Sequence, residues 1–137
     1  MKKKILEFQN LSISFQKNQK VVNNLSFSLY EKETLALVGE SGSGKSMTAN
    51  SIIKLLPFGS SLTGEIILQN KNLLETSEEE MCTIRGREIG FIFQEPMTAL
   101  NPLKTIGEQV SEVIRIHKKI NKFDALNSAA TILDRVG

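Results

Sequence analysis

The chain has 137 residues, of which 40% are hydrophobic and 23% charged. This is ordinary for a soluble globular protein and allows one domain with a modest core. The formal net charge of +2 is too small to indicate nucleic acid or an acidic membrane as a partner, and the one basic cluster, Lys2 to Lys4, is typical of a solvated terminus. No run approaches the roughly 18 apolar residues of a membrane span, so we expect a cytosolic protein that reaches a membrane only through a partner.

Two antiparallel strands are predicted at the start of the chain, over residues 5–14 and 21–30. In the second, Leu25 and Leu29 belong to a set of apolar residues that alternates with polar ones. This period of two is typical of a half-buried strand. In the first strand the alternation is interrupted near Asn10.

The middle of the chain predicts a strand, a loop and a helix, followed by one more strand. Residues 34–38 (TLALV) form a short continuous apolar run, which is typical of a strand buried on both faces. A glycine-rich loop follows, and residues 45–56 predict a helix that ends before Pro57. Residues 63–68 (TGEIIL) predict the further strand.

The last part of the chain predicts helices around one buried strand. Residues 75–85 indicate a short helix with a Ser or Thr cap and glutamates in its first turn. Residues 89–93 (IGFIF) are a second fully apolar run and predict another strand buried on both faces. Two amphipathic helices are expected to close the chain, over residues 106–114 and 123–133.

The loop GESGSGKS fits the phosphate-binding pattern G-x-x-x-x-G-K-[ST] in full, with Gly39, Gly44, Lys45 and Ser46 at its fixed positions. Glycines allow backbone angles that side chains block, so the N–H groups can point inward, and the start of the next helix adds partial positive charge. Lys45 is expected to reach the β- and γ-phosphates of a nucleotide, and Ser46 to give its hydroxyl group to Mg²⁺.

A GTPase is one alternative, because residues 121–124 (NKFD) match the guanine-reading pattern N-K-x-D and residues 134–137 (DRVG) match D-x-x-G. The order is wrong, however: GTPases place D-x-x-G between the phosphate loop and N-K-x-D, whereas here no aspartate precedes Asp124. We expect instead that Asn121 caps a helix and that Asp124 lies in its first turn, near the positive end of the helix dipole.

A small-molecule kinase is a second alternative. It requires acidic and basic groups around an acceptor site, and only Arg85 and Arg87, on either side of Gly86, suggest such groups. Two solvated arginines at a helix end are the simpler interpretation. Both alternatives are therefore less favoured than the one that follows.

The third interpretation rests on a resemblance. Besides the phosphate loop, residues 89–102 (IGFIFQEPMTALNP) are similar to the segment around the Q-loop of ABC transporter ATPases, particularly in the oligopeptide and dipeptide importer branch. Residues 105–119 (TIGEQVSEVIRIHKK) and 132–137 (ILDRVG) resemble the helical subdomain that follows in that branch. The resemblance covers essentially the whole chain in the same order.

The resemblance implies a fold class and a division of the chain. The fold is α/β, a P-loop NTPase of the ABC ATPase type in incomplete form. It comprises an N-terminal antiparallel β-subdomain, the Walker A strand, loop and helix, the Q-loop and the start of the helical subdomain. Within one ATP-binding domain over residues 1–137, residues 1–94 are expected to hold the β-subdomain and nucleotide-binding core. Residues 95–137 are expected to hold the Q-loop and the start of the helical subdomain.

The resemblance also implies ATP and Mg²⁺ as ligands and assigns their contacts. Gln94 matches the Q-loop glutamine, which is expected to act in catalysis at the γ-phosphate side of the site. Phe15 matches the aromatic residue that stacks on adenine. Metal contacts are expected from Ser46 and Gln94. The remaining nucleotide contacts are expected from the loop and the helix start: Gly39, Glu40, Ser41, Gly42, Ser43, Gly44, Lys45, Ser46 and Met47.

Later motifs of the family do not occur in these residues: the signature LSGGQ, the Walker B strand ending in Asp-Glu, and the switch histidine. Residues 130–134 (ATILD) imitate a Walker B strand, but Arg135 follows instead of glutamate and the spacing is helical. Without those carboxylates we expect this chain alone to hydrolyse ATP poorly or not at all. The missing strands should also leave an apolar face of the sheet uncovered.

Two functions remain open. The chain is the ATP-binding part of a peptide-type importer ATPase that couples ATP binding and hydrolysis to solute uptake, or it is a stand-alone nucleotide-binding or interaction module without hydrolysis. The first implies as partners the membrane subunits, through the Q-loop region, a second ATPase subunit and, indirectly, a solute-binding protein. It implies no nucleic acid, and a peripheral location on the cytoplasmic face of the cell membrane.

Overall fold

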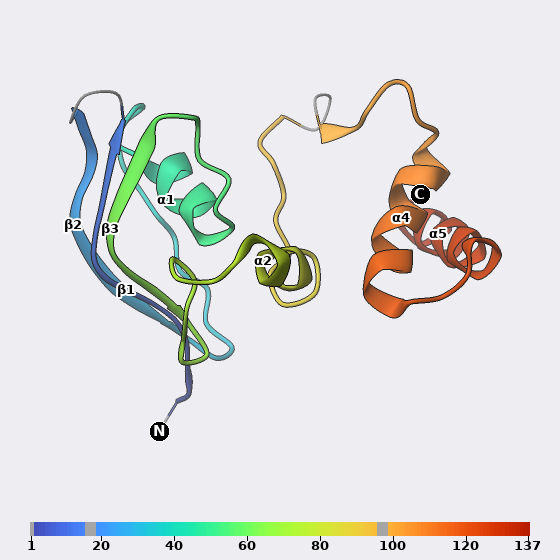
Figure 1. Ribbon diagram of the computed structural model, residues 1–137, viewed down its shortest axis with the longest axis horizontal. Helices are drawn as coiled ribbons and strands as arrows, with labels where there is room; N and C mark the ends of the chain where they lie inside the picture. Colours follow the sequence, from blue (N-terminus) through green and yellow to red (C-terminus); the bar gives the residue numbers. More distant parts are fainter. Residues whose placement is uncertain (1, 16–18, 96–98) are drawn as a thin grey trace. The chain divides into compact units, whose positions relative to one another are not determined.

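The computed structural model describes residues 2–15, 19–95 and 99–137 of the chain (Figure 1). They form two compact units, residues 1–81 and residues 82–137. A β-sheet with one helix makes up most of the first unit, and helices dominate the second. Within the described parts, no helix is both long enough and apolar enough to cross a membrane.

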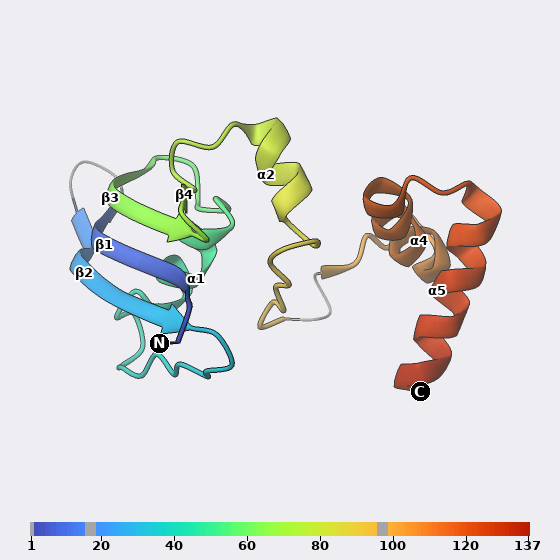
Figure 2. The ribbon, with the colours of Figure 1, turned by 90° about the horizontal axis from the view of Figure 1, so that it is seen from below.

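A sheet of four antiparallel strands organises the first unit, with the order β2-β1-β3-β4 (Figure 2). The three longer strands confirm the strands that the alternating sequence predicted, each with slightly wider bounds. The strands are β1 (Lys4–Phe15), β2 (Gln19–Tyr30), β3 (Ser60–Leu68) and β4 (Lys71–Asn72).

A β-bulge at Asn10 keeps the apolar side chains of β1 on one face. Before the bulge the buried residue has an even number: Phe8 is 1% exposed. After the bulge the buried residues have odd numbers: Leu11 and Ile13 are fully buried. Asn10 supplies the extra residue in a left-handed conformation (φ 51°), and its N–H group donates to Ser26 Oγ at 2.8 Å. The interrupted alternation in the sequence therefore marks a bulge within one continuous strand.

Helix α1 ends earlier than the sequence predicts. Lys54 follows it in a left-handed conformation (φ 53°) and donates from Nζ to the carbonyl oxygens of Leu74 and Thr76, at 3.2 and 2.8 Å. These hydrogen bonds hold the segment after the helix against residues 74–76. The helix therefore ends before Lys54 and does not extend to Pro57. The helices whose bounds are described are α1 (Lys45–Ile52), α2 (Glu78–Ile84), α4 (Ile106–Lys118) and α5 (Lys122–Val136).

Helices α4 and α5 pack on each other around small side chains. Ala125 and Ala129 are fully buried, and Ile114 is 9% exposed against them. The alanines are four residues apart, so they lie on the same face of α5 and let α4 approach closely. Asn121 Oδ1 accepts the N–H group of Asp124 at 2.9 Å, which confirms the helix cap that the sequence predicted.

Two predicted strands, at residues 34–38 and 89–93, are wrong. Both segments lack strand structure apart from a single bridge between Arg85 and Ile89, and Val38 and Ile92 are 93% and 97% exposed. An apolar run becomes a buried strand only where neighbouring strands pair with it on both edges. Within the described residues, neither segment belongs to the sheet, whose strands are β2, β1, β3 and β4.

Candidate nucleotide-binding site

The predicted phosphate loop closes around its own lysine. Lys45 Nζ donates to the carbonyl oxygens of Gly39 and Glu40, at 2.8 and 2.6 Å, and lies 3.3 Å from Ser43 Oγ. The N–H group of Ser43 in turn donates to the carbonyl oxygen of Glu40 at 3.2 Å. The Lys45 ammonium group therefore lies against the backbone of a short glycine-rich loop, the kind of loop that binds phosphate groups in other proteins.

Glycine is required at the point where the loop enters α1. Gly44 is the N-cap residue of α1 and has φ +88°, a left-handed angle that side chains disfavour. A Cβ atom at this position would lie 2.7 Å from Val22 Cγ2 and 3.0 Å from the carbonyl oxygen of Val21. Because Gly44 has no side chain, α1 begins directly against strand β2.

The start of α1 suits an anion. Its first turn contains no acidic residue, and its N-cap makes no side-chain hydrogen bond, so the first N–H groups and the positive end of the helix dipole remain available to a ligand. Ser46 is exposed in this turn, and Met47 is half-buried. Together with the Lys45 ammonium group, this arrangement fits the phosphates of a nucleotide.

A cavity of about 310 Å³ adjoins the loop and gives the site an apolar wall. Sequence reasoning missed this wall, because strand residues such as Val21 and Leu25 carry no motif. Phe15, the predicted adenine-stacking residue, is half-buried at the end of β1 and does not line the cavity. Its role stays a prediction. The lining residues are Val21, Val22, Asn23, Leu25, Leu37, Val38, Gly39, Ser43, Lys45 and Thr48.

Gln94 lies in an exposed bend of the second compact unit, whereas Lys45 belongs to the first. The expected convergence of both residues on one Mg²⁺ ion therefore stays a prediction. Among the described residues, no three His, Cys, Asp or Glu side chains gather as a metal cluster.

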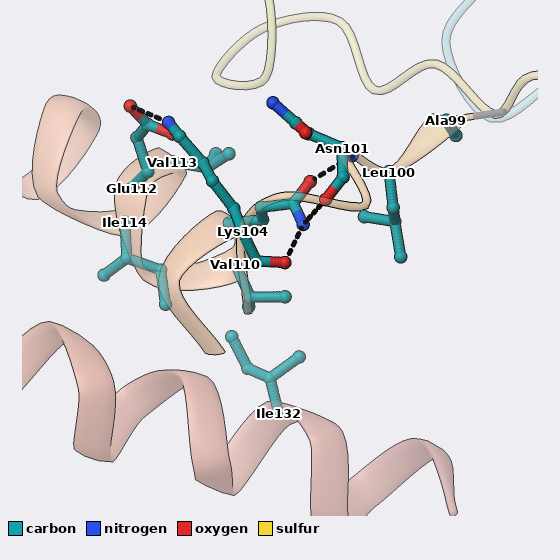
Figure 3. A pocket seen from close by; sticks show the side chains of 10 residues that line it. Ala99, Leu100, Asn101, Lys104, Val110, Glu112, Val113, Ile114 and Ile132 are labelled. Carbon is teal, nitrogen blue, oxygen red and sulfur yellow. Dashed lines mark hydrogen bonds and ion pairs between the residues drawn. The ribbon is translucent and has the colours of Figure 1, made fainter. Parts of the chain in front are cut away.

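A second hollow, of about 560 Å³, lies in the helical unit just after the predicted Q-loop (Figure 3). Gln109 fixes its polar edge, since Nε2 donates to the carbonyl oxygens of Asn101 and Lys104, both at 3.0 Å, and Oε1 accepts the Asn101 N–H group at 2.8 Å. No sequence motif indicated this hollow. The largely apolar lining is Ala99, Leu100, Asn101, Lys104, Gln109, Val110, Glu112, Val113, Ile114 and Ile132.

A glycine loop that closes on Lys45 at the start of α1 defines a P-loop nucleotide-binding protein. The sequence model of the ABC transporter family matches residues 22–137, and the chain belongs to this family. The expected family is thereby confirmed.

Curated relatives and a solved structure agree with this assignment. The chain is 45% identical to the oligopeptide transport ATP-binding protein OppD and 46% identical to the dipeptide transport ATP-binding protein DppD, both of Bacillus subtilis (strain 168). Each match covers 98% of this chain. The ATP-binding cassette MJ0796, solved as a dimer bound to ADP and Pi, matches 95% of the chain with a TM-score of 0.79 and 25% identity. The predicted resemblance to oligopeptide and dipeptide importer ATPases is confirmed.

The chain spans only part of these proteins. It covers 39% of OppD, 42% of DppD and 56% of the MJ0796 chain. The family and the N-terminal part of its fold are therefore shown, while the activity of a whole transporter ATPase is a separate question.

Proposed function

We propose that this chain is the ATP-binding portion of a peptide-type ABC importer ATPase, which couples ATP binding and hydrolysis to solute uptake. The observation that carries the proposal is the loop closed around Lys45, with three acceptors within 3.3 Å. Peptide as the solute class is supported by the similarity to OppD and DppD, whose names state oligopeptide and dipeptide transport.

In this proposal the triphosphate of ATP binds along the loop from Gly39 to Ser46. Lys45 holds the β- and γ-phosphates, and the N–H groups at the start of α1 face the same anion. Bound Mg²⁺ neutralises charge on the phosphates, and the exposed hydroxyl of Ser46 and the amide of Gln94 are the groups of this chain that would hold it. The adenosine would lie on the side of the apolar wall at Val22, and we propose Phe15 as the residue that stacks on the adenine.

We further propose that hydrolysis requires the family's later motifs, which do not occur in these residues. The exposed apolar side chains of Val38 and Ile92 support this, because neighbouring strands would bury such runs in a complete parallel sheet. The same exposure disfavours a stand-alone module, since a stable independent domain rarely leaves its most apolar segments in water. The proposed domain division stays at residues 94 and 95.

The proposed partners follow from the helical unit. The apolar hollow beside Val110 and Val113 follows the Q-loop in the sequence, and we propose that it receives apolar side chains of a membrane subunit. The dimer in which MJ0796 was solved supports a second ATPase subunit as the other partner. A solute-binding protein would act only indirectly, and the chain would be peripheral on the cytoplasmic face of the membrane.

The test has two parts. Equilibrium dialysis measures the binding of Mg-ATP and Mg-GTP, and ATP hydrolysis is measured for the chain produced alone and for the chain co-expressed with the remaining C-terminal part of OppD. We expect ATP binding by the chain alone and hydrolysis only after the second polypeptide is supplied. Tighter binding of GTP, or no nucleotide binding in either preparation, would overturn the proposal. Hydrolysis by the chain alone would contradict only the requirement for the later motifs.

A further inference from the structure

A basic segment surrounds the turn between α4 and α5. Over residues 115–122 (RIHKKINK), Arg115, Lys118, Lys119 and Lys122 carry four positive charges, and no acidic residue occurs. All four residues are exposed. The low net charge of the whole chain conceals this cluster, and the expectation that only the N-terminal lysines form a basic cluster is therefore wrong.

The cluster continues across two neighbouring hollows in the surface. One, of about 410 Å³, is lined by Glu112, Arg115, Ile116, Lys119 and Ile120. The other, of about 380 Å³, shares Glu112 and Arg115 with it. Its cations also include Lys104 and Lys122. The two hollows form one continuous surface, which we call the basic turn surface.

The acidic residues of this surface are already engaged. Glu112 Oε2 pairs with Lys104 Nζ at 3.1 Å. Glu108 accepts hydrogen bonds from the N–H and hydroxyl groups of Thr105, at 3.2 and 3.0 Å. By contrast, the side chains of Arg115 and Lys119 make no hydrogen bond or ion pair among the described residues. Lys122 makes no hydrogen bond there either, although its charge helps to lower the pKa of Glu108, after the hydrogen bonds from Thr105. The charges of Arg115 and Lys119 are therefore available to an external anion, and Lys122 adds a third cation beside them.

Exposed apolar side chains accompany these cations. Ile116, which lines the first hollow, is 61% exposed, and Phe123, next to Lys122, is 72% exposed. Basic residues together with apolar ones that enter the headgroup region are typical of peripheral binding to anionic membranes. Lysine is depleted in protein–protein interfaces, so the lysine content favours a lipid surface over an acidic protein.

We propose that the basic turn surface binds the anionic headgroups of a phospholipid bilayer, with Ile116 and Phe123 inserted at the interface. The inference rests on the proposed function to the extent that a transporter ATPase works beside a membrane. It adds a direct lipid contact made by this chain, independent of its protein partners. The contact should weaken with salt, because screening shortens the range of exposed charges.

The test is flotation of the full chain with vesicles of phosphatidylglycerol and phosphatidylcholine in equal parts, compared with pure phosphatidylcholine. The double variant K119E/K122E reverses two charges of this surface, and we expect its partition onto anionic vesicles to fall about tenfold or more. The matched control K3E/K20E makes the same change in net charge within the other compact unit and should lose little. The variant Phe123→Ser should lose binding without any change in charge.

An equal loss in the control variant, or unchanged binding of K119E/K122E, would overturn the proposal. So would equal binding to uncharged vesicles, no vesicle binding at all, or a preference of the same residues for an acidic protein or nucleic acid. Circular dichroism and Mg-ATP binding are measured on every variant. If the unchanged chain binds ATP but not vesicles, the lipid proposal fails and the proposed function stands. If it binds vesicles but not ATP, the proposed function fails and the lipid proposal stands.

Discussion

The ammonium group of Lys45 lies 2.6 Å from the carbonyl oxygen of Glu40, within the same loop. With its bond to Gly39, the lysine spans the loop and uses backbone acceptors where a nucleotide would offer phosphate oxygens. A charged phosphate is the stronger acceptor, because hydrogen bonds between ionised partners are roughly twice as strong as neutral ones. The loop is therefore organised around a cation.

The first prediction is that Lys45→Ala weakens Mg-ATP binding roughly tenfold to a hundredfold, since a hydrogen bond to a charged group contributes about 1.5–3 kcal/mol. Isothermal titration calorimetry would measure the change. Lys71→Ala is the matched control, because this exposed lysine of the same unit only pairs with Glu80 at 3.0 Å. Equal affinities of both variants would show that Lys45 does not contact the phosphates.

The second prediction compares two glycines of the loop. Gly42 has φ +79° and open space around it, so Gly42→Ala should cost about 1 kcal/mol of backbone strain. Gly44→Ala adds a collision with Val22 Cγ2 and with the Val21 carbonyl, and should cost about 3 kcal/mol or more. Thermal unfolding would measure both. Equal destabilisation would mean that α1 does not lie against β2 as described.

Much of the fold could be predicted from local sequence because local rules determine it. The bulge at Asn10 keeps the apolar side chains of β1 on one face. Strand β2 contains a similar feature, because Asn24 is left-handed (φ 50°) and its N–H group donates to Ser12 Oγ at 2.9 Å. The cap at Asn121 likewise depends only on residues within one helical turn. The complete motif G-x-x-x-x-G-K-[ST] likewise located a loop that bonds to Lys45 and leads into α1.

The errors concern features that depend on distant parts of a protein. Residues 34–38 have the composition of a buried strand, but strand structure requires partners that composition does not reveal. The apolar wall at Val21 and Val22 could not be predicted from the sequence. These strand residues line the site only because α1 packs against them in the folded chain. The relation of Gln94 to Lys45 is not one of these errors and stays a prediction, because the two residues belong to different compact units.

The third prediction concerns pH and the capping box of α4. Hydrogen bonds from the backbone and side chain of Thr105 lower the pKa of Glu108 below its ordinary value of 4.5. A carboxyl group with a lowered folded-state pKa contributes stability that is present above 4.5 and is lost as the pH falls through the folded-state pKa.

Thermal unfolding of wild type and Glu108→Gln, measured from neutral to acidic pH, would test this. The difference in stability between them should be largest near neutral pH and should shrink below pH 4.5. Glu79→Gln, in the first turn of α2, is the control for general loss of a carboxylate. A difference that stays constant with pH would contradict the capping role.

The fourth prediction concerns the bulge. Gly64 has φ +94°, and a Cβ atom there would lie 2.5 Å from the carbonyl oxygen of Asn10. Because that neighbour is backbone within a paired strand, it cannot move without disturbing the sheet between β1 and β3. Gly64→Ala should therefore destabilise the chain by about 3 kcal/mol or more.

Gly59→Ala is the matched control, since Gly59 has a similar angle (φ +86°) with nothing near its Cβ position. We expect it to cost about 1 kcal/mol, the strain of a left-handed residue alone. Urea unfolding followed by circular dichroism would give both free energies. If the two variants unfold at the same urea concentration, the close approach of β3 to the Asn10 bulge contributes nothing, and the bulge is held by the Ser26 hydroxyl alone.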